Sequence, residues 1–160
     1  DALHEAAGST EPLHMHGELE RLRCERCGAV VRDRESLDPD RFVPCAACGH
    51  ARLRPDVVWF GEVPFGLDRI ERALAACTCF VAIGTSGVVY PAAALLAAAR
   101  SAGARTIVNS LDAPDNLHPA DDFRPGPAGT VVPALVRELA RPESHPENDP
   151  GSHPENERIA

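Results

Sequence analysis

The sequence predicts an α/β protein in which a small module with four cysteines is inserted beside a partial parallel sheet. Three observations predict this fold: apolar runs at 79–83 and 105–109, a helix-forming stretch at 91–102 between them, and two Cys-x-x-Cys pairs nearer the N-terminus. A strand, a helix and a strand in this order form a βαβ unit with parallel strands and a right-handed crossover. The unbroken apolar run at 79–83 is typical of a strand buried on both faces of such a sheet.

Length and composition are those of a globular protein with one domain-sized core. The chain has 160 residues, of which 44% are hydrophobic, and a net charge of -8. Proteins that bind nucleic acid usually need clustered cations, so this acidic balance argues against a nucleic-acid partner. The most apolar stretch, 91–99, is too short to cross a bilayer. No signal-peptide pattern opens the chain, so we expect a cytoplasmic protein that does not associate with membranes.

Two extended segments are expected in the first half of the chain. Residues 18–24 alternate loosely and are expected to form a strand that leads into the first cysteine pair. Residues 53–60 form an extended run with an apolar block that stops at Gly61, which indicates a strand followed by a loop. An amphipathic helix should come next, because apolar side chains recur there at helical spacing, at Leu67, Ile70, Leu74 and Cys77.

The C-terminal third should contain two helices and a tail. The stretch 91–102 is closed by Gly103, a residue that suits a helix C-terminus, and 131–139 is expected to form the last helix. Residues 142–160 are polar and proline-rich and contain Ser-His-Pro-Glu-Asn twice, so we expect them to be disordered. Ligands of parallel sheets bind beyond the carboxyl ends of the strands, which here are 84–86 and 109–111.

The two Cys-x-x-Cys pairs have the spacing of a zinc ribbon, with seventeen residues between them. Four thiolates complete a tetrahedron, so the expected zinc ion is structural, and its ligands would be Cys24, Cys27, Cys45 and Cys48. The alternative is a pair of redox-active dithiols or disulfides, which a cytosolic location disfavours. Cys77 and Cys79 lie at a helix–strand junction and are expected to be small buried hydrophobic residues.

Two histidines, His14 and His16, stand directly before Gly17 and ahead of the cysteine module. Histidine is the commonest general base, because its pKa lies near neutral pH. On the spacing alone, the pair fits extra metal ligands or part of a surface turn, and the surface turn is the favoured interpretation.

Five motifs in order resemble the sirtuin family over nearly all of residues 1–140. They are Asp-Ala-Leu-His with Ala-Gly at 1–8, His-Met-His-Gly-Glu-Leu at 14–19, the two cysteine pairs, Arg-Pro-Asp-Val-Val-Trp-Phe-Gly-Glu at 54–62, and Gly-Thr-Ser followed by Val-Tyr-Pro-Ala-Ala at 84–93. The residues at 14–19 and 57–62 are similar to those of the bacterial and mitochondrial branch of the family, which removes acetyl or acidic acyl groups. The resemblance therefore implies a partial Rossmann-like sheet with an inserted zinc ribbon.

The resemblance also implies an activity, in which a lysine deacylase consumes NAD and acts on acyl-lysine proteins or peptides. The products are free lysine, nicotinamide and O-acyl-ADP-ribose. In this family pattern His16 matches the general base that takes a proton from a ribose hydroxyl, and His14 shapes the site. Asp1 matches an acid that contacts the nicotinamide amide.

Residues 58–62 match the family loop that receives the substrate peptide as an added strand. The substrate-binding residues implied are Val58, Trp59, Phe60, Gly61 and Glu62. The carbonyl of Val58 would hold the lysine nitrogen, while the apolar side chains enclose the acyl-lysine. The alternative is that these residues, Trp59 above all, belong to the core.

The NAD contacts implied by the resemblance lie at the carboxyl ends of the predicted strands. They are Gly84, Thr85, Ser86, Asn109, Ser110, Leu111 and Ala128. Small residues at 84–86 allow close approach of the backbone to the ligand. Ser110 stands where the family usually has a large apolar residue, which leaves the register of the adenine contact open.

The family's first strand and its glycine-rich phosphate loop would lie before Asp1, so we expect this chain to be a fragment that is inactive by itself. The expected organisation is a remnant of the Rossmann domain at 1–17, the zinc ribbon at 18–56, the C-terminal half of the NAD-binding domain at 57–141 and the tail at 142–160. An alternative of a different class is a non-catalytic zinc-ribbon binding module of sirtuin ancestry. The specific acyl group, the substrate protein and the oligomeric state do not follow from the sequence.

Overall fold

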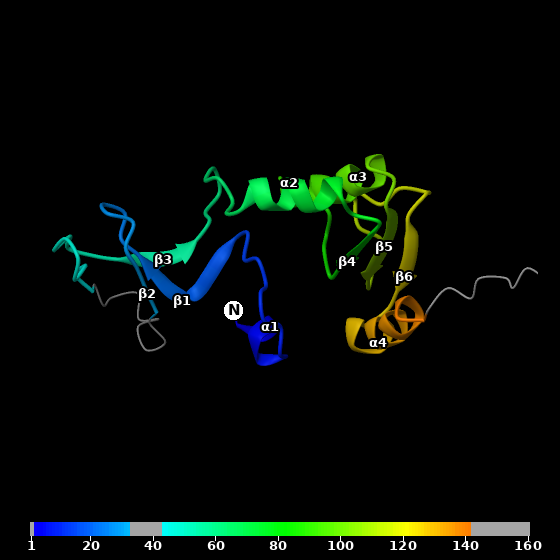
Figure 1. Cartoon of the computed structure of the whole chain (residues 1–160), viewed down its shortest axis with the longest axis horizontal. Coiled ribbons are helices and arrows are strands. Elements are labelled where there is room, and N and C mark those ends of the chain that lie inside the picture. The colour runs from blue at the N-terminus through cyan, green and yellow to red at the C-terminus, as the bar shows by residue number, and fades with distance from the viewer. Residues whose placement is uncertain (1, 33–42, 142–160) are drawn as a thin grey trace, which may run out of the picture.

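The computed structural model describes residues 2–32 and 43–141. They form two three-stranded sheets at opposite ends of an elongated molecule, with a helix, α2 (Leu67–Ala75), between them (Figure 1). Asp1, an expected nicotinamide contact, and the tail at 142–160, expected to be disordered, fall outside the described residues. Among the described residues, no helix is both long and apolar enough to cross a membrane.

The first sheet is antiparallel and belongs to the cysteine module. Its central strand is β1 (Gly17–Arg23), flanked by β2 (Val30–Arg32) and β3 (Arg54–Val57). An irregularity between Glu18 and Leu22 shifts the register of β1 against β3, so that Gly17 pairs with Val57 and Arg23 with Arg54. The strands expected at 18–24 and 53–60 are confirmed as β1 and β3, whereas β2 was not anticipated.

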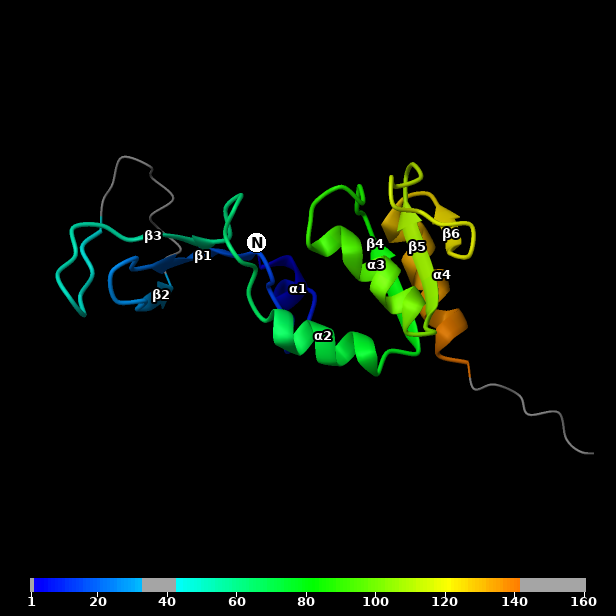
Figure 2. The same ribbon diagram turned by 90° about the horizontal axis from the view of Figure 1, so that it is seen from above.

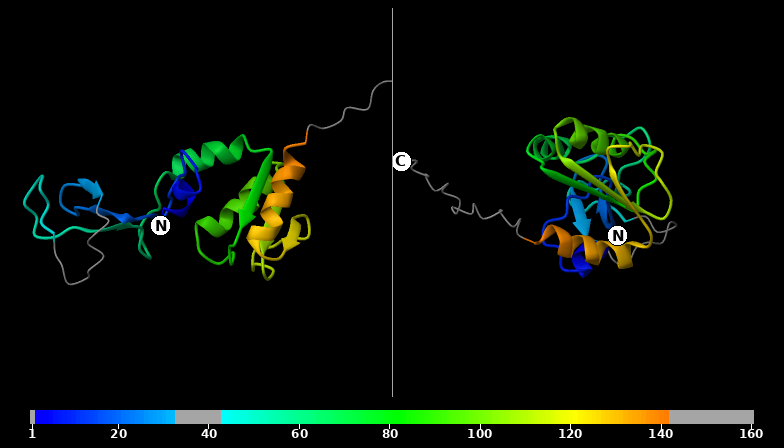
Figure 3. Two further views of the ribbon diagram at one scale, coloured as in Figure 1. Left: turned by 90° about the horizontal axis from the view of Figure 1, so that it is seen from below. Right: turned by 90° about the vertical axis from the view of Figure 1, so that its right-hand side faces the viewer.

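The second sheet is parallel, as the sequence predicts. Its order is β4-β5-β6, with β4 (Cys79–Ile83), β5 (Arg105–Ser110) and β6 (Asp122–Pro125). Helices α3 (Ala92–Ser101) and α4 (Ala128–Leu139) lie on opposite faces of this sheet, as the end-on view in Figure 3 shows, and both contact β5. The core therefore centres on β5, where Ile107, Val108 and Asn109 are fully buried.

Two expectations about burial at β4 are wrong. The strand is only half-buried, and Ile83 is 47% exposed, because within residues 2–32 and 43–141 β4 has a hydrogen-bonded neighbour, β5, on one side only. Cys79 is exposed and Cys77 is partly exposed, with the Cys77 thiol donating to the Cys79 carbonyl at 3.0 Å. These cysteines are thus not buried hydrophobic residues, since the segment around them lacks a covering layer among the described residues.

The helices follow the predicted pattern with small changes at their ends. α2 stops before Cys77, which lies in the turn to β4, and α4 begins three residues earlier than predicted. A short helix, α1 (Leu3–Ala6), precedes the histidine segment; it overlaps the start of α2 in the view of Figure 2 but lies well apart from α2 in Figure 1. Neither α1 nor β6 was anticipated, because Asp-Phe-Arg-Pro and Leu-His-Glu-Ala carry no clear periodicity.

Candidate functional site

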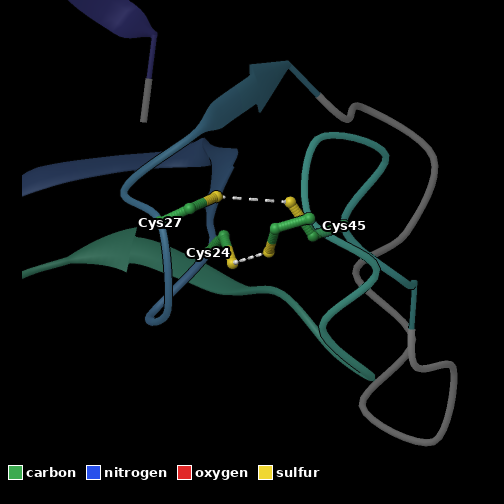
Figure 4. Close-up of side chains that lie close together, drawn as sticks. Cys24, Cys27 and Cys45 are labelled. Carbon is green, nitrogen blue, oxygen red and sulfur yellow. Dashed lines mark hydrogen bonds between the residues drawn. The ribbon is translucent and has the colours of Figure 1, made fainter.

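The four cysteines of the two pairs come together into one cluster. Their sulfur atoms all lie within 4.8 Å of one another, and Cys24–Cys48 and Cys27–Cys45 are separated by 3.6 Å (Figure 4). A tetrahedron of sulfurs about 2.3 Å from a zinc ion has edges of about 3.8 Å, whereas the sulfurs of a disulfide are about 2.0 Å apart. The cluster therefore fits a structural zinc ion, and none of the four cysteines is in a disulfide in this structure.

Each pair is shaped by the glycine that follows it. Gly28 has a φ of 74° and donates its N–H to the Cys24 carbonyl at 2.9 Å, while Gly49 has a φ of 69° and donates to the Cys45 carbonyl at 2.8 Å. This left-handed conformation is one that glycine adopts readily. Burial raises the pKa of the Cys24 thiol, but backbone N–H groups of the knuckle outweigh it and lower that pKa to about 7. A thiol with this pKa is readily deprotonated for metal binding.

The segment 14–17 is held against the loop that follows β3. The N–H of Val58 donates to the carbonyl of His16 at 2.9 Å, and the N–H of Phe65 donates to the carbonyl of Met15 at 2.9 Å. Gly17 has a φ of 83°, and a Cβ at this position would lie 2.0 Å from the Asp56 carbonyl oxygen. Glycine is therefore required at position 17, directly after His16, for β1 and β3 to approach this closely.

His16 and the predicted substrate-binding residues line one open groove with a volume of about 420 Å³. The groove is bounded by His16, Val58, Trp59, Phe60, Gly61, Glu62, Pro64, Val89 and Tyr90. Trp59 is 53% exposed and Phe60 is fully exposed, so these residues are not core. Val89 and Tyr90 were not among the predicted site residues, although they closely follow the 84–86 turn and could have been recognised as part of that loop.

Arg54 and Glu62 form contacts with each other and with Trp59, one of the residues that line this groove. The guanidinium of Arg54 forms two hydrogen bonds with the Glu62 carboxylate, at 2.5 Å and 2.9 Å, and lies 3.6 Å from the centre of the Trp59 ring. The same carboxylate accepts the N–H of Trp59 at 2.9 Å. Hydrogen bonding from Arg54 lowers the pKa of Glu62 to about 2. Glu62 therefore lines the groove with its carboxylate already engaged by Arg54.

The predicted NAD contacts lie along the carboxyl edge of the parallel sheet. Gly84 follows β4 with a φ of 65° and open space where a Cβ would stand, and its N–H donates to the Asn109 carbonyl at 2.8 Å. Thr85 accepts the N–H of Gly87 on its hydroxyl oxygen at 3.2 Å. Residues 84–86 do not line the groove that contains His16, so the two parts of the predicted site do not share that groove, although Val89 and Tyr90, a few residues after the turn, line it.

Asn109 is fully buried at this edge. Its side-chain amide donates to the carbonyls of Arg124 at 2.7 Å and Gly126 at 3.1 Å, and its Oδ1 atom has no hydrogen-bond partner among the described residues. Ser110 donates its hydroxyl to the Asp112 carbonyl, Leu111 is 70% exposed, and Ala128 opens α4.

Comparisons with known proteins agree with this architecture. The family model described as Sir2 family matches residues 1–91. An NAD-dependent protein deacylase from Caulobacter vibrioides is 49% identical over 140 residues, which cover 87% of this chain and 58% of the relative. The deacylase of the same description from Shewanella oneidensis is 48% identical over 136 residues, covering 85% of this chain and 56% of the relative. The chain thus spans a little over half the length of these relatives.

Solved structures show the same likeness. A Sir2 homologue in complex with NAD has a TM-score of 0.78 and 37% identity, and the match covers 87% of this chain and 55% of that one. A Sir2 protein bound to a myristoylated histone peptide has a TM-score of 0.71 and 33% identity, with 87% and 61% covered. These matches, together with the cysteine cluster and the parallel sheet, confirm the resemblance found in the sequence: the chain belongs to the Sir2 family.

Proposed function

We propose that the protein carrying this chain is an NAD-dependent protein-lysine deacylase, with His16 as its general base. The observation that carries this proposal is that His16 lines the same groove as residues 58–62, the segment that resembles a peptide-binding loop. The relatives named as NAD-dependent protein deacylases and the neighbour bound to an acylated peptide support it. Because the chain spans a little over half of those relatives, the activity is proposed for the whole protein.

The groove suits an acyl-lysine peptide. Its walls are mostly apolar, and residues 58 and 59 continue from β3 before the turn at 60–61, so a peptide can add as a strand along this segment. In this arrangement the main chain of residues 58–61 binds the peptide backbone, the Val58 carbonyl accepts the substrate lysine N–H, and Trp59 and Phe60 exclude water from the acyl chain.

The carboxyl edge of the parallel sheet would hold NAD. Gly84, Thr85 and Ser86 offer a small-residue turn with open space, while Asn109, Ser110, Leu111 and Ala128 form the neighbouring wall. Asp1 would contribute on the nicotinamide side. Bound NAD supplies the electrophilic ribose carbon from which nicotinamide departs. His16 would take a proton from a ribose hydroxyl, which requires its ring to be neutral and to face the groove.

The zinc ion would have no part in the chemistry. Four sulfur ligands leave no open coordination position, so the ion would hold the module from which β1 and β3 present His16 and the loop 58–62.

The test is nicotinamide release by the full-length protein with acetyl-lysine and succinyl-lysine peptides. The proposal expects release that depends on NAD and peptide, and a loss of at least about 100-fold in kcat for His16→Ala. His118→Gln is a matched control, because His118 is exposed and lies outside the groove.

Equal activity of His16→Ala and the unchanged protein would refute the role of His16. Zinc binding without nicotinamide release would favour the non-catalytic module instead. Comparison of the two peptides decides whether acetyl or succinyl groups are removed.

A further inference from the structure

A cluster of two carboxylates and an imidazole surrounds the side chain of His14, two residues before His16. It consists of Glu5 on α1, His14 before β1, and Glu18 on β1. The Nε2 atom of His14 is 2.6 Å from Oε1 of Glu5 and 3.8 Å from Oε1 of Glu18. The second oxygen of Glu18 accepts a hydrogen bond from Arg21 at 2.6 Å. The cluster thus forms a chain of polar contacts that joins α1 to β1.

The contacts within this cluster are shielded from solvent. The side chains of His14 and Glu18 are 19% and 15% exposed, and that of Glu5 is 34% exposed. A hydrogen bond from His14 lowers the pKa of Glu5, so the Glu5 carboxylate is ionised at neutral pH and acts as the acceptor. His14 must therefore carry its hydrogen on Nε2, which fixes both the tautomer and the orientation of the ring relative to α1.

His14 stands two residues before His16 in a segment whose backbone is also fixed. The N–H of Gly17 donates to the His14 carbonyl at 2.9 Å, and the carbonyls of Met15 and His16 accept N–H groups from Phe65 and Val58. These bonds connect the segment to the loop after β3. The side chain of His14 supplies a second connection, to Glu5 on α1, so that the segment is held through its backbone and through a side chain.

We infer that His14 is a positioning residue for His16. Anchored by Glu5 and Glu18, it fixes the backbone from which the His16 ring projects into the groove, and so aligns the general base. This inference rests on the proposed function. A reacting group displaced by about 1 Å loses on the order of 100-fold in rate, so loss of this anchor has a kinetic cost without any change in peptide or NAD contacts.

The kinetic test uses four variants of the full-length protein and one control variant. His14→Leu, which cannot donate to Glu5, is expected to lower kcat by about 10- to 100-fold, with both Michaelis constants within about twofold of the unchanged protein. His14→Gln, whose amide can still donate, is expected to keep most of the activity. Glu5→Ala should match His14→Leu, and combining these two changes should cost no more than His14→Leu alone, because both remove one contact. Glu11→Gln is the control, since Glu11 is an exposed acid of the same loop.

Two results would overturn the inference. One is a kcat for His14→Leu within about twofold of that of the unchanged protein. The other is a loss that is equal in His14→Leu and His14→Gln and is accompanied in both by a lower unfolding temperature, since that pattern marks a structural role alone.

A readout that needs no catalysis separates this inference from the proposed function. The NMR signals of the His16 ring, assigned by their absence in His16→Ala, are expected to shift or broaden in His14→Leu and to stay in place in Glu11→Gln. Unchanged His16 signals in His14→Leu would refute the positioning role, even if the full-length protein proved to have no deacylase activity. Displaced signals in an inactive protein would refute only the proposed function.

Discussion

Arg54 and Glu62 are joined by two hydrogen bonds, and the Arg54 guanidinium lies against the face of the Trp59 ring, 3.6 Å from its centre. Arg54 is buried in β3, where it pairs with Arg23, the residue that precedes Cys24 of the metal cluster. Glu62 closes the loop that lines the groove with His16. This pair therefore connects the cysteine module to the proposed substrate loop.

Replacing Arg54 should impair the peptide side of the reaction. Arg54→Gln removes both bonds to Glu62 and the bond to the Val57 carbonyl at 2.8 Å, so the loop 58–62 loses its support. We expect the Michaelis constant for the peptide to rise roughly tenfold while that for NAD stays unchanged, as hydrogen bonds to charged groups contribute about 1.5–3 kcal/mol. Steady-state kinetics check this. Arg69→Gln, an exposed arginine with a weak contact to Glu11, should leave both constants unchanged; equal effects of the two variants would contradict the prediction.

The pair should also influence stability in acid. The pKa of Glu62 is about 2 in the folded chain, below its ordinary value of 4.5. Because the pKa of Glu62 is lower in the folded chain, its interaction with Arg54 stabilises the fold fully above about pH 4.5. This stabilisation disappears as the pH falls through about 2. We therefore expect Glu62→Gln to unfold at a lower temperature than the unchanged protein near pH 6, and the difference to shrink as the pH approaches about 2.

Thermal unfolding followed by circular dichroism over this pH range measures the difference. Acid releases zinc from both proteins, so only the difference between them reports on Glu62. A difference that stays constant down to about pH 2 would show that the Arg54–Glu62 pair does not titrate as described.

Loss of one cysteine ligand should release the metal. Cys24→Ser removes one of the four clustered sulfurs, and a structural site that has lost one of its four ligands binds zinc far more weakly. We expect about one zinc ion per chain in the unchanged protein and clearly less in Cys24→Ser, together with a lower unfolding temperature. Elemental analysis gives the zinc content. Cys77→Ser is the matched control, because Cys77 lies outside the cluster, and equal zinc loss in both variants would refute the assignment.

The close approach of β1 and β3 at Gly17 should tolerate no side chain. In Gly17→Ala the new Cβ would meet the Asp56 carbonyl at 2.0 Å and the φ of 83° would be strained, so we expect a loss of about 3 kcal/mol or more in the free energy of unfolding. Gly8→Ala has a similar φ, 95°, with open space around it, and should cost only about 1–2 kcal/mol. Urea unfolding compares the two. Similar losses would show that the contact with Asp56 is not decisive.

Local signals in the sequence were enough to predict several elements. The spacing of Cys24, Cys27, Cys45 and Cys48 predicted a cluster that the structure contains, because two residues between cysteines direct both sulfurs to one point. The apolar runs at 79–83 and 105–109 predicted parallel strands, because their composition depends on burial within a sheet. The order of the motifs predicted the Sir2 family.

Other features depend on contacts between distant segments and leave no local pattern. β6 has the composition of a loop and becomes a strand because its backbone pairs with β5, and the Asn109 amide bonds to Gly126, seventeen residues away. The apolar run at 79–83 predicted a fully buried strand, but β4 lies at the edge of the described sheet. The residues of the run do not show whether another strand pairs with β4 on its second side. The sequence by itself therefore determined the metal cluster, the main strands and helices and the family. Only the tertiary structure decided which residues share a groove with His16 and that Arg54 engages Glu62, because backbone and side-chain bonds between remote segments set those distances.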